Sequence, residues 1–219
     1  MKSSNRAKRE ILIRLRKAGA QAQAAKATTY SQWQSDSEPE RIERFQTALT
    51  ANHAEVIKMN CDDIQTSLEK VYQSHDIKRL TVGSNGEFYH SIMQASQKLH
   101  IRQFDKEIEY WKSELFSEID AGVTHSLAGI ADTGTIVLWP SISEPRTLSL
   151  IPPIHIVLIR QSTITSNFTQ LMRSQQWHRK MPTNAVLISG PSKTADIQQT
   201  LAYGAHGPSK LIVLLIEDR

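Results

Sequence analysis

The spacing of apolar residues divides the chain into a short first part and a long second part. Apolar positions within residues 1–17 recur at helical intervals among basic ones, which predicts an amphipathic basic helix. Residues 19–37 are small and polar with no steady period, as in a linker or an extended arm. We therefore expect a basic helix and linker over residues 1–37 and one folded domain over residues 38–219.

Helical and strand patterns alternate in the first half of this domain. A helix is expected to begin after Ser37, which can cap it, with Pro39 in its first turn. The elements that follow are expected as a strand at 54–59, a helix at 62–73, a strand at 79–83 and a helix within 86–100. This alternation predicts parallel βαβ units and an α/β sheet.

The second half of the domain contains more strand-like segments. Two β-branched runs within residues 121–139 are separated by "GIADTG", which predicts an antiparallel hairpin inserted in the sheet. Almost wholly apolar runs, as in strands buried on both faces, occupy 154–159, 184–189 and 210–217. Helical patterns begin near Thr163 and near Thr194. The predicted fold class is α/β, a mainly parallel sheet flanked by helices with an antiparallel hairpin.

Composition narrows the class of protein. A chain of 219 residues with 39% hydrophobic and 22% charged residues has the make-up of a globular protein. It has no run of about 18 apolar residues and no apolar secretory segment, so we expect a cytoplasmic protein without a membrane span. Cys61 is the one cysteine, which excludes an internal disulfide and a cluster held by four thiolates of this chain.

The net charge of +4 is concentrated at the start of the chain, where seven basic residues fall within residues 1–17. Such a helix can dock its apolar stripe on a neighbouring surface or serve as a partner-binding arm. The sequence contains no recognised nucleic-acid-reading module and no interleaved aromatic platform, which argues against binding to nucleic acid.

Two glycine-containing loops are candidates for ligand binding. Gly83 and Gly86 lie between a strand and a helix, where backbone amides can hold an anion, although a plain tight turn is the better explanation of this spacing. The second loop is read either as a satisfied hairpin turn or as a ligand-binding loop, and it consists of Asp132, Thr133, Gly134 and Thr135.

A third loop follows the strand at 184–189. Ser192 is expected to cap a helix whose amino end, with Lys193 beside it, can bind an anion. Gly204 is expected to end that helix. The other candidate binding residues here are Ser189, Gly190, Thr194 and Gly207.

The same region contains side chains that could take part in catalysis. Asp196 and His206, together with Ser192, match a nucleophilic triad in composition, but their spacing does not establish contact. The candidate catalytic residues are therefore Asp196, His206 and Asp132, with no role assigned. A metal site built from His125, His155 and His206 is not supported by the spacing.

Three segments in order, "GIADTGTIVL", "SLIPPIHIVLIRQSTI" and "ISGPSKTADIQQTLAYGAHGPSKLIVLLIED", resemble the lactate-utilisation protein C family, whose members share the LUD domain. The match spans roughly residues 118–219. The resemblance implies the fold of the NagB, ribose phosphate isomerase and CoA-transferase group. The family's motif usually has Glu where this chain has Asp132, which places the carboxylate about one methylene away.

The resemblance implies that the chain works with two iron–sulfur proteins that oxidise L-lactate to pyruvate. This chain would be an accessory subunit without a cofactor of its own, and the clusters would belong to the partners. A second interpretation stays open, in which the domain binds or converts a small anionic ligand such as a carboxylate, phosphate or CoA compound. The sequence leaves open whether the chain is an enzyme and whether it forms a homo-oligomer.

Overall fold

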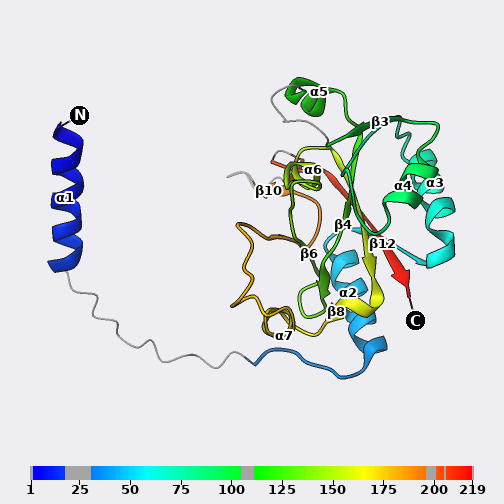
Figure 1. The fold of residues 1–219 in the computed structure, drawn as a ribbon. Helices are drawn as coiled ribbons and strands as arrows, with labels where there is room; N and C mark the ends of the chain where they lie inside the picture. The colour runs from blue at the N-terminus through cyan, green and yellow to red at the C-terminus, as the bar shows by residue number, and fades with distance from the viewer. Residues whose placement is uncertain (1, 18–30, 105–110, 196–200, 205, 219) are drawn as a thin grey trace. The chain divides into compact units, whose positions relative to one another are not determined.

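The computed structural model describes residues 2–17, 31–104, 111–195, 201–204 and 206–218. The chain separates into two compact units, Met1–Gln32 and Trp33–Arg219 (Figure 1). The first unit contains the expected basic helix, α1 (Lys2–Lys17), on which Ile11, Leu12 and Ile13 are exposed. All other elements belong to the second unit.

A six-stranded sheet forms the centre of the second unit, and every neighbouring pair in it is parallel. Across the sheet the strands are β1 (Glu55–Asn60), β12 (Lys210–Glu217), β7 (Ile154–Arg160), β4 (Ala121–His125), β2 (Arg79–Val82) and β3 (His100–Gln103). Leu211 to Ile216 of β12 are all buried, so this strand faces apolar layers on both sides. The mainly parallel α/β fold predicted from the sequence is confirmed.

Two helices cover one face of this sheet, α3 (Ile64–Ser74) and α4 (Tyr89–Ala95), which lie on the same side in Figure 1. Their buried Leu68 and Ile92 belong to one apolar cluster with Ile156 of β7 and Leu214 of β12. Short helical segments occur elsewhere at Cys61–Asp63, α5 (Lys112–Ser117), α6 (Thr147–Leu150) and Gln161–Thr163.

The other face packs against α2 (Glu38–Ala51) and a four-stranded sheet. That sheet has the order β8 (Ile164–Thr165), β5 (Ala128–Ile130), β6 (Thr135–Leu138) and β9 (Val186–Ile188). Buried Phe45 and Leu49 of α2 contact the cluster between the sheets. Ser37 caps α2, its hydroxyl accepting a hydrogen bond from the Glu40 amide at 3.4 Å, as the sequence predicts. Helix α7 (Phe168–Ser174) packs on the small sheet through Leu171.

The predicted hairpin is present as β5 and β6, which pair antiparallel, but it is not inserted in the parallel sheet. It belongs to the small sheet, while the apolar run before it forms β4 of the large one. The chain changes sheets directly after His125, because the Ser126 amide bonds the Leu158 carbonyl and the Leu127 amide bonds the Val137 carbonyl.

The helix expected from Thr194 is wrong. Lys193–Ala195 forms β10, which pairs antiparallel with β11 (Leu201–Tyr203). The Gly204 amide donates to the Ser192 carbonyl at 2.9 Å, so the two ends of the segment are held together. A ten-residue helix would separate its ends by about 15 Å, which this contact excludes.

Two other predicted elements need correction. β9 was expected to be buried on both faces, but it is the edge strand of the small sheet and Leu187 is 49% exposed. The helix expected near Thr163 begins only at Phe168, where the Asn167 side chain caps it. The sequence pattern did not predict β3, α5 or α6, which are short elements.

Candidate functional site

Residues 186–192 and 206–208 enclose a cavity of about 210 Å³ beside the amino ends of β7 and β12. We call it the motif cavity. The predicted binding residues that line it are Ser189, Gly190, Ser192, His206 and Gly207. Segments that are distant in sequence therefore meet at one small site. This site lies at the amino ends of the strands, opposite their carboxyl ends.

Backbone contacts hold the wall of this cavity in place. The Ser192 amide, expected to lie at a helix start, instead donates to the Pro208 carbonyl at 2.8 Å. The Ser209 amide donates to the Pro153 carbonyl at 2.9 Å, which fixes the second segment beside the start of β7. Gly190 lies so close to α2 that a Cβ there would come 2.7 Å from the Asn52 carbonyl oxygen. These turns are thus positioned by the large sheet and by α2.

The loop with Asp132 lies apart from this cavity. Asp132 pairs with Arg44 of α2 at 3.2 Å and lines a second cavity, of about 410 Å³, together with Trp33. The connection between the two regions is a pair of hydroxyl contacts, Thr133 Oγ1 to Thr135 Oγ1 at 2.6 Å and Thr135 Oγ1 to Ser189 Oγ at 2.7 Å. Asp132 and His206 do not line a common cavity in the described structure.

The other predicted residues of this region are only partly gathered at the motif cavity. Lys193 is exposed on β10, the strand to which Thr194 also belongs, and Lys193 is not among the described residues that line the cavity. Gly204 has a φ of +83° and follows β11, where it turns the chain rather than capping a helix. Asp196 lies outside the described residues. The structure therefore places Ser192 and His206 at one cavity.

His155 is a residue of the motif cavity that the sequence pattern did not single out for binding. It is 1% exposed and lines the cavity from β7. Its Nε2 lies 2.8 Å from Thr124 Oγ1, while its Nδ1 is buried and has no hydrogen-bond partner among the described residues. Burial lowers the pKa of His155 to about 3, so the ring is neutral at physiological pH.

The loop with Gly83 and Gly86 lies at the carboxyl edge of the sheet, where β2 ends. The amides expected to hold an anion already donate within the protein: Ser84 to the Ser143 carbonyl at 2.9 Å and Gly86 to Asn85 Oδ1 at 2.8 Å. A Cβ on Gly83 would lie 2.7 Å from Ser143 O, and one on Gly86 would overlap the His125 ring. Close packing therefore explains both glycines.

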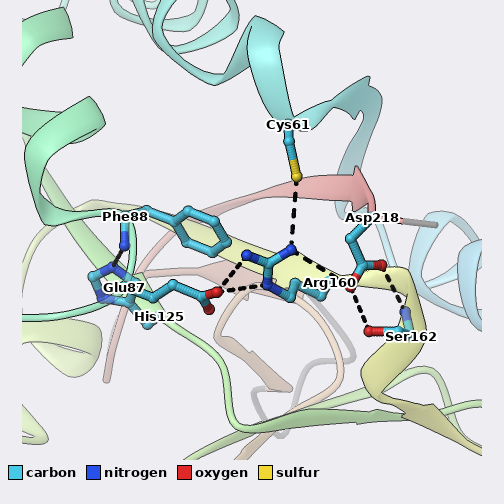
Figure 2. Close-up of polar contacts among 7 residues, drawn as sticks. All are labelled: Cys61, Glu87, Phe88, His125, Arg160, Ser162 and Asp218. Carbon is cyan, nitrogen blue, oxygen red and sulfur yellow. Dashed lines mark hydrogen bonds and ion pairs between the residues drawn. The ribbon is translucent and has the colours of Figure 1, made fainter.

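His125, the last residue of β4, is oriented by contacts at both of its ring nitrogens. Its Nδ1 lies 2.7 Å from Glu144 Oε2, and the Phe88 amide donates to its Nε2 at 3.0 Å. Because Nε2 accepts a hydrogen bond, the ring proton is on Nδ1 and is shared with the carboxylate. Both ring nitrogens are thus engaged, and Figure 2 shows the Phe88 contact.

Arg160, at the end of β7, is the centre of the contacts in Figure 2. Its guanidinium pairs with Glu87 through Nε and Nη2, reaches Asp218 at 3.5 Å and lies 5.0 Å from the centre of the Phe88 ring. Its Nη1 lies 3.6 Å from Cys61 Sγ. Hydrogen bonding to Glu87 raises the pKa of Arg160 above its usual range, so its charge is permanent.

Asp218, the residue after β12, contacts this arginine. Burial raises the pKa of Asp218, but hydrogen bonds from the Ser162 hydroxyl and amide, together with the charge of Arg160, outweigh it and hold the pKa below the usual value. The Ser162 amide donates to Asp218 Oδ1 at 3.0 Å. Asp218 therefore remains ionised and fixes the position of Arg160.

A wider hollow of about 450 Å³ opens beside this network, and its lining includes Glu87, His125, Glu144 and Ser141. Two of its lining side chains, Glu87 and Glu144, are carboxylates, which repel an anion. Within the described ranges, no three His, Cys, Asp or Glu side chains are grouped closely enough to hold a metal ion. The same ranges contain no helix with the length and apolar character needed to cross a membrane.

A family model described as the LUD domain matches residues 42–216. The chain belongs to the LUD domain family. It is 38% identical over 184 residues to an uncharacterized protein of Neisseria meningitidis serogroup B, covering 82% of this chain and 78% of that protein. It is 28% identical to Lactate utilization protein C of Anoxybacillus flavithermus, covering 85% of each. The family predicted from the three sequence segments is confirmed.

A solved structure supports the fold of this LUD domain independently. It is a DUF162 family protein from Deinococcus radiodurans, with a TM-score of 0.62 and 20% sequence identity. The match covers 82% of this chain and 98% of that one. At this identity the likeness shows the shared fold, and the site must be argued from the residues of this chain.

Proposed function

We propose that this chain is an accessory subunit of a lactate-oxidising system and that its motif cavity binds a small organic acid of that reaction. The observation that carries the proposal is the meeting of residues 186–192 and 206–208 around one cavity of about 210 Å³. Sites for drug-sized ligands measure roughly 300–1,000 Å³, so this volume suits a smaller molecule. The relative from Anoxybacillus flavithermus is named for lactate utilization, which supplies the substrate class.

The electron transfer is assigned to partner proteins in this proposal. An iron–sulfur cluster is commonly held by four cysteine thiolates, and the sequence has one cysteine, Cys61. We therefore assign the clusters to two iron–sulfur proteins that work with this chain. The exposed apolar residues of α1, Ile11, Leu12 and Ile13, sit among basic side chains and support α1 as the docking element.

Lactate-dependent dye reduction tests the proposal. The two iron–sulfur partners are purified together and assayed with this chain, without it, and with the His206→Ala variant. His90→Ala is the matched control, because His90 is also exposed but lies on α4, on the other face of the large sheet. Association is measured in parallel by co-purification.

We expect activity to require the chain and to fall with His206→Ala while the complex still assembles. His90→Ala should behave as the wild type. If dye reduction is the same with and without this chain, the accessory role is wrong. If the chain is required but His206→Ala has full activity, the motif cavity is not where this chain serves the reaction.

A further inference from the structure

A hollow of about 450 Å³ lies at the carboxyl ends of β2 and β4, the point where the large sheet reverses its winding. Within this sheet the chain passes from β2 to β3 on one side, whereas from β4 it passes to β7 and β12 on the other. Open α/β sheets bind ligands outside the carboxyl ends of their strands at such a point. Glu87 after β2 and Ser126 after β4 both line the hollow, which we call the switch-point hollow.

The walls of this hollow are partly apolar and partly polar. Leu127 and Trp139 belong to the apolar part, and Ser141 and Ser143 contribute hydroxyl groups. Trp139 packs edge-to-face on Trp177, with ring centroids 5.2 Å apart, which holds its indole in place. Sites for drug-sized ligands measure roughly 300–1,000 Å³, so the hollow has room for a small organic molecule.

Glu144 lines the hollow with a carboxylate that neutral groups hold in place. Its Oε1 accepts from the His125 amide at 2.8 Å and its Oε2 from His125 Nδ1 at 2.7 Å. The Phe88 amide donates to Nε2 of the same ring, so Nε2 carries no proton and the ring donates as a neutral group. The Glu144 side chain is 17% exposed, and no Lys or Arg of the described ranges pairs with it. A carboxylate so far removed from water is stabilised by a positive charge, which the described residues do not supply here.

Arg160, the cation of the neighbouring network, is already engaged. Its guanidinium pairs with Glu87 and with Asp218, as Figure 2 shows. Glu87 also lines the hollow, and the described lining contains no Lys or Arg. With Glu144 included, this edge of the sheet has three carboxylates and one guanidinium, so its potential is negative and attracts a cation.

The rest of the lining decides which kind of cation fits. Within the described ranges no three His, Cys, Asp or Glu side chains lie close enough together to hold a metal ion. An indole ring in the wall instead favours an organic cation, because the ring attracts positive charge and packs against alkyl groups. We propose that the switch-point hollow binds a small primary amine, whose ammonium group donates to Glu144 and whose alkyl chain lies against Trp139. An ammonium has three N–H donors, and the hydroxyls of Ser141 and Ser143 can accept the others.

NMR titration of the wild-type full-length chain tests the ligand class. The probes are n-butylamine, 1-butanol and butyrate, which carry similar alkyl chains and differ in charge at neutral pH. The indole N–H signal of Trp139 is the one missing from a Trp139→Phe sample. We expect n-butylamine to shift this signal and to bind about tenfold or more tightly than 1-butanol, because its ammonium forms a charge-assisted hydrogen bond. Butyrate should not bind. Equal affinity for the amine and the alcohol, or no response of the Trp139 signal to the amine, would overturn the proposal.

Two glutamate variants test the role of Glu144. Glu144→Gln keeps the size of the side chain and removes its charge, so it should weaken n-butylamine binding about tenfold and leave 1-butanol binding little changed. Glu69→Gln is the matched control, because Glu69 on α3 also accepts from a neutral donor, Gln65, and is not among the described residues that line the hollow. Unchanged amine binding by Glu144→Gln would overturn the proposal. The comparison of probes on the wild type decides the ligand class even if Glu144→Gln folds poorly.

This inference does not rest on the proposed function, because the switch-point hollow and the motif cavity lie at opposite ends of the strands of the large sheet. If dye reduction requires the chain but n-butylamine does not bind, the cation site fails and the accessory role stands. If n-butylamine binds through Glu144 but the chain is not needed for dye reduction, the cation site stands and the accessory role fails.

Discussion

Acid should destabilise the folded protein through His155, and the size of the effect follows from its burial. In the unfolded chain this side chain takes up a proton near its ordinary pKa of about 6.5, whereas burial lowers its pKa in the folded protein to about 3. Between these two values the unfolded state binds one more proton than the folded state. The contribution of the neutral His155 ring to the free energy of unfolding is therefore fully present above about pH 6.5 and is lost progressively as the pH falls below this value.

The magnitude is about 1.4 kcal/mol per pH unit within this window. From about pH 7 to about pH 4.5 the protonation of His155 should lower the free energy of unfolding by about 2.5 kcal/mol. His155→Phe removes the titrating group while keeping a ring of similar size. It also leaves the Thr124 hydroxyl without its partner, a cost that does not change with pH.

Urea denaturation of the wild type and of His155→Phe over this pH range gives the test. The variant should gain about 2.5 kcal/mol relative to the wild type as the pH is lowered, whatever the difference between the two proteins at neutral pH. Other acidic and basic groups titrate in both proteins and cancel in the comparison. Parallel pH profiles for the two proteins would refute the account of His155 as a buried, neutral ring.

Three further predictions concern other contacts. Gly134→Ala should cost about 2–4 kcal/mol in urea denaturation, because Gly134 has a φ of +58° and a Cβ there would meet α2 at 2.6 Å. In Gly207→Ala the new Cβ would come no closer than 3.2 Å to another atom, so this variant should lose less than about 1 kcal/mol of the free energy of unfolding. Equal losses in the two variants would contradict this account. The wild type should be more stable than Asp218→Asn above the ordinary aspartate pKa, and this advantage should shrink as the pH falls through the lowered pKa of the folded protein. A difference in stability that does not change with pH would contradict the anchoring role of Asp218. Glu144→Ala should speed solvent exchange of the His125 Nδ1 proton in NMR spectra, which an unchanged exchange rate would disprove.

The central strands of the large sheet could be predicted because burial on both faces leaves a clear pattern. Residues 154–159 and 210–217 are almost wholly apolar, and both are central strands in the structure. The segment after Thr194 has apolar residues at helical intervals, but the Gly204–Ser192 contact folds it back as β10 and β11. The spacing of apolar residues within the segment could not reveal that its two ends are in contact.

Only part of the candidate site could be predicted, because the sequence pattern indicates loops but not the tertiary contacts between them. The turn residues Ser192 and His206 could be found from their own loops, and both line the motif cavity. His155 could not, because in sequence it is one polar residue in an apolar strand, and its place beside the cavity follows from the tertiary fold. Likewise, the Arg160 network joins residues from four separate parts of the chain.

The most direct test of the central claim, that the motif cavity is the ligand site, is a crystal structure of the full chain with pyruvate. The account predicts pyruvate in the cavity between residues 186–192 and 206–208. Pyruvate bound instead at the carboxyl edge of the sheet, against Arg160 in place of Glu87, would contradict it.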